Sequence, residues 1–229
     1  MRYATKWGGL APRFHPDLFD RRFSRESEDA FDLVSGTSAQ LMKGPGGRKF
    51  VFRAPGRVSA WHNGQAVESE AVRRGSAVAA DLTRMLLLGP LFFQRTVIAF
   101  PPEEKTSRVA DAECDVILAL LQPGLGLSDE DRVLLSIDRK TNRLRRLRTT
   151  LNGLADGPGK ELEITFGAWG ERSGVWWATE YDERINAPWN LHARHWRLLD
   201  LKANKGFAPR APELFGEAAR AAVSAGSPD

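Results

Sequence analysis

The chain has little of several features that would point to a particular chemistry or location. Cys114 is the only cysteine among 229 residues, so an intrachain disulfide is excluded and the redox compartment stays open. No apolar run reaches the length of about 18 residues that a transmembrane helix needs. Residues 1–19 carry basic side chains but no apolar stretch followed by a small-residue cleavage site. Either the protein is cytoplasmic or an export signal is missing from this chain, and the residues alone favour the cytoplasm.

The motifs of common enzyme classes are missing as well. The Gly-rich turns at 44–47 and 157–159 lack the frames of a P-loop and of a dinucleotide-binding loop. Glu161 and Glu163 alternate with apolar residues, which is typical of solvated carboxylates on a strand. Cys114 lies in an apolar stretch and is expected to be a small buried hydrophobe. No nucleophile is accompanied by a base, so we predict neither an enzyme nor a cofactor.

His192 and His195 have a spacing that occurs in metal sites on helices and turns. They fall in a segment predicted to be a strand, where residues three apart point to opposite faces. No cluster of cysteines or carboxylates completes a set of ligands, although Asp182 and Glu183 lie upstream. We predict that the protein has no metal site.

The composition is that of an ordinary globular protein. Hydrophobic residues make up 42% and charged residues 27% of the chain, with a net charge of +4 and a pI near 9.4. This length suits one large all-β or α+β domain. The basic surplus is spread along the chain and indicates a solvated surface, so a nucleic-acid partner is not predicted.

Residues 132–153 carry the clearest structural signal. Val133, Leu135 and Ile137 alternate with more polar neighbours, turn-forming residues follow, and a second run contains leucines among arginines. This pattern predicts a β-hairpin. The leucines change parity between Leu144 and Leu147, which predicts a β-bulge near Arg145.

Further strands are predicted on both sides of this hairpin. The Asn63-Gly64 pair is a strong two-residue hairpin signal between alternating segments. We assign an irregular N-terminal segment at 1–27 with a short helix near Pro16–Ser24, a curved-sheet domain at 28–207, and a short C-terminal tail or helix at 208–229. The strands predicted within the middle segment include 29–33, 39–43, 49–53, 57–62, 65–72, 95–100, 111–122, 161–166, 175–183 and 192–204.

Residues 76–94 interrupt the strand pattern. Val78, Leu82, Met85 and Leu86 share one helical face, and the residues up to Phe93 make the last turns apolar on nearly all sides. Such a helix must be buried or must cover an apolar surface. We predict that it begins near Ser76, lies on the concave side of the sheet and breaks at Gly89-Pro90.

The succession "IDRKTNRLRRL", "LEITFGAW", "SGVWWATEY" and "HWRLLDLKANKGF", together with "FRAPGRVSAWHNGQ", resembles the LolA-like and LppX-like lipoprotein-carrier superfamily over 49–65 and 131–206. The resemblance implies a mainly β (α+β) fold, with a strongly curved antiparallel sheet forming an open half-barrel and a hydrophobic helix on its concave face. It also implies non-enzymatic binding of an apolar or lipid-like ligand, such as an acyl chain, by a carrier or accessory protein of the periplasm or cell envelope.

The candidate cavity residues are large apolar side chains from several parts of the chain. Each of them could instead fill the core, and the cavity could be filled by the protein's own helix, as in an adaptor or an enzyme of unknown chemistry. The candidates are Trp61, Leu82, Met85, Leu86, Phe92, Phe93, Trp176 and Trp177.

Four arginines in the hairpin form a possible cationic ridge. It could meet an anionic lipid headgroup. The preferred interpretation is a solvated sheet face whose arginines pair with Glu161 and Glu163 on the next strand. The four are Arg143, Arg145, Arg146 and Arg148.

Overall fold

The computed structural model describes residues 1–94, 97–157, 159–186, 189–207 and 211–225. Strands in the first part of the chain are joined by short turns, and at Asn63-Gly64 both residues have positive φ, 50° and 89°. Asparagine and glycine tolerate this conformation, so the predicted hairpin forms there. These strands are β1 (Arg2–Trp7), β2 (Glu26–Asp32), β3 (Thr37–Gly44), β4 (Gly47–Ala54), β5 (Arg57–His62) and β6 (Gln65–Ala66).

The remaining strands follow a helical block that comprises α3 (Glu70–Leu88) and the 3₁₀ helix η1 (Gly89–Gln94). The short helices α1 (Ala11–Phe14) and α2 (Pro16–Phe19) lie near the N-terminus, and α4 (Ala211–Ser224) follows the last strand. The strands are β7 (Val97–Phe100), β8 (Thr106–Val109), β9 (Ala112–Leu121), β10 (Asp131–Asp138), β11 (Leu144–Thr150), β12 (Glu161–Phe166), β13 (Trp169–Arg172), β14 (Val175–Ala178), β15 (Glu180–Asn186) and β16 (Asn190–Asp200).

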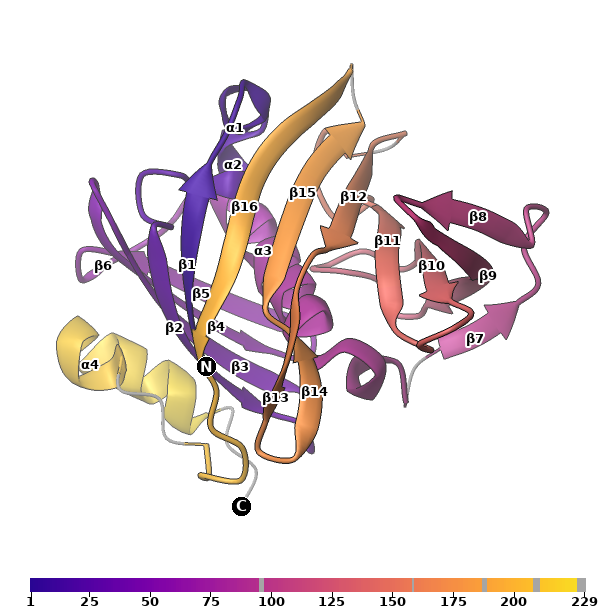
Figure 1. The fold of residues 1–229 in the computed structure, drawn as a ribbon. Coiled ribbons are helices and arrows are strands. Elements are labelled where there is room, and N and C mark those ends of the chain that lie inside the picture. Colours follow the sequence, from indigo (N-terminus) through magenta and orange to yellow (C-terminus); the bar gives the residue numbers. More distant parts are fainter. Residues whose placement is uncertain (95–96, 158, 187–188, 208–210, 226–229) are drawn as a thin grey trace.

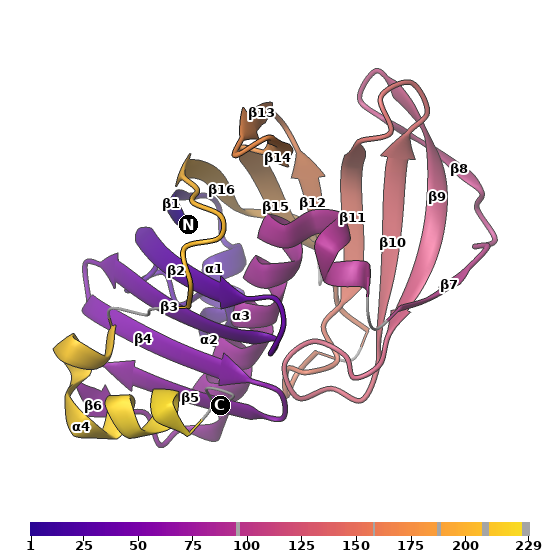
Figure 2. The same cartoon turned by 90° about the horizontal axis from the view of Figure 1, so that it is seen from below.

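Fourteen strands of the described chain form one antiparallel sheet in the order β6-β5-β4-β3-β2-β1-β16-β15-β12-β11-β10-β9-β7, with β8 also paired to β9. Strands β13 and β14 make a separate hairpin. The sheet is strongly curved but does not close, and α3 lies inside the curve between β3–β5 and β9–β12 (Figures 1 and 2). The predicted fold class, an open half-barrel with a hydrophobic helix on its concave face, is confirmed.

Helix α3 begins earlier than predicted. The hydroxyl of Ser69 accepts a hydrogen bond from the backbone N–H of Val72, and Glu70 pairs with Arg73 and Arg74 one turn on. This cap and these i,i+3 and i,i+4 pairs stabilise a start at Glu70. The predicted start at Ser76 is therefore wrong, and so is the predicted strand 65–72, of which only β6 forms. The predicted break at Gly89 is confirmed, because α3 ends there and η1 begins.

Helix α4 packs on the outer face of β3–β5, opposite α3 (Figure 2). Successive residues of β4 point to these two sides: Phe50 and Phe52 join a cluster with Phe215 of α4, while Val51 joins one with Ala80 of α3. The sheet is thus buried on both faces here, which explains why β4 is an almost continuous buried run.

Several short strands were not predicted. Strand β1 lies in the N-terminal segment that the prolines and glycines led us to expect as irregular, yet it pairs with both β2 and β16. Strand β8 lies between the predicted strands 95–100 and 111–122, and β13 lies between the predicted strands 161–166 and 175–183. The predicted strand 175–183 is divided between β14 and β15. Each is four to seven residues long, so the local sequence pattern carries little signal. Whether such a strand forms depends on the strands with which it pairs.

Candidate functional site

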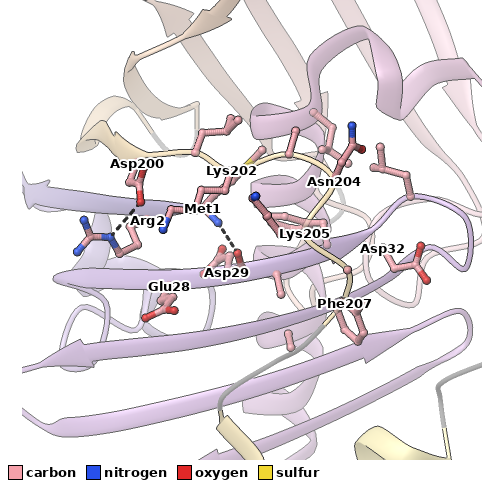
Figure 3. A pocket seen from close by; sticks show the side chains of 18 of the residues that line it. Met1, Arg2, Glu28, Asp29, Asp32, Asp200, Lys202, Asn204, Lys205 and Phe207 are labelled. Carbon is pink, nitrogen blue, oxygen red and sulfur yellow. Dashed lines mark hydrogen bonds and ion pairs between the residues drawn. The ribbon is translucent and has the colours of Figure 1, made fainter. Parts of the chain in front are cut away.

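The strands β2 and β16 separate at the N-terminal end of β1, the strand that lies between them. Strand β1 begins at Arg2, which lies opposite Glu28 of β2 and Asp200 of β16. Both neighbours continue beyond this point: β2 extends to Asp32, and the chain after β16 runs on through residues 201–207. No strand separates them there in the described chain, so a cleft opens between β2 and the 201–207 segment (Figure 3).

The cleft has a volume of about 870 Å³, within the range of small-molecule sites. Its floor reaches the C-terminal end of α3 at Leu88 and the hairpin residue Trp177, and Phe207 lies at the outer side. The apolar lining is drawn from β2, β3, β4, α3, β14, the β2–β3 turn and the 201–207 segment. It consists of Ala30, Phe31, Leu33, Val34, Ala39, Leu41, Phe50, Leu88, Trp177, Leu201, Ala203 and Phe207.

Charged groups surround this apolar lining. Arg2 pairs with Asp200 at 3.9 Å, and the Met1 ammonium donates a hydrogen bond to the Asp29 carbonyl at 2.6 Å. Lys202 and Lys205 are exposed on the 201–207 segment, and neither makes an ion pair with another described residue. An apolar pocket with unpaired cations at its edge suits a ligand with an apolar body and an anionic end.

Asp29 is a buried carboxyl in the wall of the cleft. It is 2% exposed and accepts hydrogen bonds from Ser27 and from Nε2 of Gln40, the latter at 2.7 Å. Burial disfavours the charged form more than these donors stabilise it, and raises the pKa of Asp29 to about 6. The group therefore titrates in the folded protein at a pH where an exposed aspartate is already ionised.

This titration predicts a pH-dependent stability. The folded state binds the Asp29 proton more tightly than the unfolded state, so the free energy of unfolding should fall as pH rises from about 4 to about 6, by roughly 2–3 kcal/mol. Asp29→Asn should remove this pH dependence, because asparagine does not titrate. The variant should still fold, since the Oε1 atom of Gln40 has no hydrogen-bond partner among the described residues and can accept the new amide N–H after a side-chain flip. Urea denaturation of both proteins at several pH values measures this. If the free energy of unfolding changed with pH by the same amount in the wild type and in Asp29→Asn, the prediction would be contradicted.

Three of the predicted cavity residues are packed tightly inside the half-barrel. Leu82, Met85 and Leu86 are at most 3% exposed and contact the same core as Trp196 and Leu147. The concave space beside them is filled by protein side chains.

The other candidates are divided among different places. Phe92 and Phe93 of η1 are half-buried at the edge of the same core, with ring centroids 5.4 Å apart. Trp61 lies in the outer cluster with Phe50 and Phe215, on the side of α4. Trp177 lines the cleft, whereas its neighbour Trp176 is exposed. The structure thus places one of the eight predicted residues in the cleft.

The arginine ridge is largely neutralised by carboxylates. The register shift between Ser136 and Ile137 leaves Arg145 as the extra residue of a bulge, as predicted. Arg145 pairs with Asp111 and Asp138, and Arg146 lies 3.8 Å from Glu163. Arg148 is opposite Glu163 in register.

Arg143 differs from the other three arginines. Its guanidinium lies 4.5 Å from the ring centroid of Trp176 and 5.7 Å from that of Trp169. Among the described residues it has no carboxylate partner, so its charge remains available to an anion outside the chain.

His192 and His195 are closer together than predicted. A register shift between β15 and β16 leaves Ala193 as an extra residue, so both imidazoles reach the same carboxylate oxygen of Asp182, at 3.5 and 3.2 Å. The prediction that strand geometry would separate them is wrong, because a bulge resets the alternation. In the part of the chain that the structure describes, no group of three or more His, Cys, Asp or Glu side chains is arranged to hold a metal.

All the residues that line the cleft, except Trp177, were missed by the sequence analysis. They come mainly from 28–34 and 201–207, which are adjacent only because the sheet parts beside β1. Their one sequence signal is the pair of apolar residues Leu33-Val34 in a turn, which is weak on its own.

Comparison with known proteins identifies the fold. No family model matches the sequence, and no curated protein matches it. Among solved structures, a LolA superfamily protein from Nitrosomonas europaea superposes with a TM-score of 0.56 at 9% identity, covering 88% of this chain and 86% of that one. A DUF1329 family protein from Desulfovibrio piger superposes with a TM-score of 0.52 at 11% identity, covering 95% and 88%. The resemblance to the LolA-like group is thus confirmed at the level of the fold.

Proposed function

We propose that this protein binds an apolar or lipid-like ligand without changing it chemically, and that the cleft between β2 and the 201–207 segment is its binding site. The observation that supports this most directly is the cleft itself, which has a volume of about 870 Å³ and is lined by large apolar side chains together with charged ones. Each methylene that a ligand buries there contributes about 0.8 kcal/mol. A carrier or accessory role in the cell envelope is part of the proposal, and the LolA-like fold supports it.

The packing of α3 is the reason to place the ligand in the cleft. The concave face is occupied by Leu82, Met85 and Leu86, which have almost no exposed surface. A ligand in the middle of the half-barrel would have to displace these side chains, whereas the cleft reaches only the last residue of the helix, Leu88. The same packing favours the second candidate function, an adaptor whose interior is filled by its own helix and which binds no ligand.

A binding experiment separates these two functions. A fatty acid with bromine on its acyl chain should quench the fluorescence of Trp177 on binding, and Trp177→Phe should lose that part of the quenching. Native mass spectrometry of gently purified protein would reveal any lipid that remains bound. An unquenched Trp177 together with a protein free of lipid would contradict ligand binding and support the adaptor.

Blocking the cleft gives a more specific prediction. Ala30 lies in its wall on β2 and is half-buried, so Ala30→Phe should fill part of the space and weaken acyl-chain binding by at least about tenfold. Ala66→Phe is the matched control, because Ala66 is exposed on the edge strand β6, away from the cleft. Equal affinities of the two variants in a fluorescence titration would place the ligand elsewhere.

A further inference from the structure

Exposed apolar side chains gather at the end of the half-barrel onto which the cleft opens. Leu33 and Val34 lie in the β2–β3 turn, and Val175 and Trp176 in the β13–β14 hairpin. They are 49%, 77%, 49% and 54% exposed. The β2–β3 turn, the hairpin and the 201–207 segment all lie at the lower end of the molecule in Figure 1. We call the surface that these three elements form the mouth surface.

The mouth surface is continuous with the cleft. Leu33 and Val34 line the cleft on one side, Trp177 lines it next to Trp176, and Lys202 lines it on the 201–207 segment. A ligand that enters or leaves the cleft on this side therefore passes Leu33 and Val34, with the exposed Trp176 next in sequence to the lining residue Trp177. Scattered apolar residues are normal on a protein surface, but a group of them around the opening of an apolar cleft marks an interaction site.

Two cations of the mouth surface and one beside it, in the β10–β11 turn, lack ion-pair partners within the described chain. Among the described residues, Lys202, Lys205 and Arg143 form no ion pair with a carboxylate, and the Arg143 guanidinium lies over the Trp176 ring at 4.5 Å. An anionic surface would complement all three.

The nearby carboxylates are mostly engaged within the protein. Asp32 accepts hydrogen bonds from the backbone N–H of Val34 and the hydroxyl of Ser35, which keeps the pKa of its carboxyl below its usual value. Asp200 pairs with Arg2. Glu28 lies at the Arg2 side of the cleft, away from Lys205 (Figure 3). Asp32 thus stays ionised, and Glu171 of the β13–β14 hairpin is exposed as well, so an anionic partner must meet the surface on the side of Lys202, Lys205 and Arg143.

We propose that the mouth surface docks on a lipid bilayer that contains anionic lipids. Trp176 and Val34 would enter the headgroup region, where tryptophan is favoured because one end of the ring is apolar and the other polar. Lys202, Lys205 and Arg143 would face the lipid phosphates. This inference rests on the proposed ligand-binding function, because docking brings the entrance of the cleft to the source or destination of an apolar ligand.

Vesicle binding tests the docking independently of ligand binding. The full chain should co-sediment with phosphatidylcholine vesicles that contain phosphatidylglycerol and much less with vesicles of phosphatidylcholine alone, and salt should weaken the binding. Trp176→Ser should reduce vesicle binding about tenfold. Lys202→Gln combined with Lys205→Gln should reduce it about 25-fold, at roughly fivefold for each charge near an anionic surface.

Matched variants at the opposite end of the molecule serve as controls. Trp189 is 65% exposed in the turn between β15 and β16, and Arg13 and Arg21 are exposed near α1 and α2. Trp189→Ser, and Arg13→Gln combined with Arg21→Gln, make the same changes in apolar surface and charge. Both should leave vesicle binding unchanged, and circular dichroism should confirm that all variants are folded.

The outcomes distinguish the two proposals. Equal binding to both kinds of vesicle, or an equal loss in the control variants, would overturn the docking, even if a brominated fatty acid still quenches Trp177. A protein that binds anionic vesicles but no brominated fatty acid would instead overturn the cleft as the ligand site and leave the docking intact. A dimer that Trp176→Ser dissociates, in a protein that binds no vesicles, would assign the mouth surface to a second copy of the chain.

Discussion

Leu82→Ala should lower the free energy of unfolding by about 3–5 kcal/mol, one of the two largest effects we expect from a single substitution. Leu82 is completely buried on α3, among core residues that come from both walls of the half-barrel. Removing its methyl groups loses transfer free energy and leaves a cavity that a curved sheet on several sides cannot readily collapse. Chemical denaturation at neutral pH measures the change.

Leu199→Ala is the matched control, since Leu199 lies on β16 but is 43% exposed. Its cost should stay below about 1 kcal/mol. If Leu82→Ala cost no more than this control, α3 would be a loosely held plug, and a ligand could enter the concave face by displacing it. A large cost makes the helix a permanent part of the core and leaves the cleft as the accessible space.

Asp81→Asn should destabilise the protein by about 3–5 kcal/mol through a buried ion pair. Asp81 of α3 accepts hydrogen bonds from Arg53 of β4 at 3.0 Å and from the backbone N–H of Gly126 at 2.8 Å. Arg53 also donates to the carbonyl of Gly126 at 2.6 Å. Strand β4, the helix and the loop before β10 meet in this one network, and neutralising the carboxylate leaves the Arg53 charge buried with less compensation.

The double variant Arg53→Met with Asp81→Leu tests the cause of that loss. It removes both charges together, so neither Arg53 nor Asp81 is left as an unpaired buried charge. Arg84, which lies 3.7 Å from Asp81, loses that carboxylate in the single and the double variant alike. The double variant should therefore cost clearly less than Asp81→Asn alone. Denaturation of the single and double variants provides the comparison. A double variant that is less stable than the single one would show that the ion pair itself, rather than avoidance of an unpaired charge, stabilises the contact.

These two predictions bear on function because they concern how rigidly α3 is held. The helix contributes apolar side chains to the core and a carboxylate to a network that joins β4 with the loop before β10. Both features stabilise the helix in the middle of the half-barrel. The ligand-binding proposal therefore depends on the cleft at the end of the helix, where Leu88 and Trp177 meet the 201–207 segment.

No helix among the described residues is long and apolar enough to cross a membrane. The vesicle binding proposed above is a contact of one surface, made by two turns and an extended segment. Its apolar part is small and its cations are few, so we expect reversible binding that depends on anionic lipid.

Much of the fold could be predicted from local patterns. The hairpin of β10 and β11 forms as expected, including the bulge at Arg145, because alternation of leucine with polar residues records which face is buried. Strand β12 follows the same rule. Strand β1 could not be predicted in this way, since it is six residues long and depends on its neighbours β2 and β16.

The candidate site was much less predictable. Trp61 and Leu82 are both large, apolar and buried, yet they lie on opposite faces of the sheet, in the outer cluster and in the main core. A strand buried on both faces carries no alternation that would distinguish the two. The His192–Asp182–His195 contact was missed for a related reason, because a single extra residue in β16 changes which side chains share a face.

By itself, the sequence determined a curved antiparallel sheet and a helix too apolar to face water, because alternation and helical periodicity depend only on near neighbours along the chain. Only the tertiary structure decided that this helix fills the concave face, and that a cleft opens where β2 and the 201–207 segment continue past Arg2. The two sides of the cleft are more than 150 positions apart, and the helix packs against residues from both halves of the chain, so no local pattern encodes either contact. The helix that the sequence suggested as the lining of a ligand cavity belongs to the core, and the cleft that we propose as the ligand site lies at its C-terminal end.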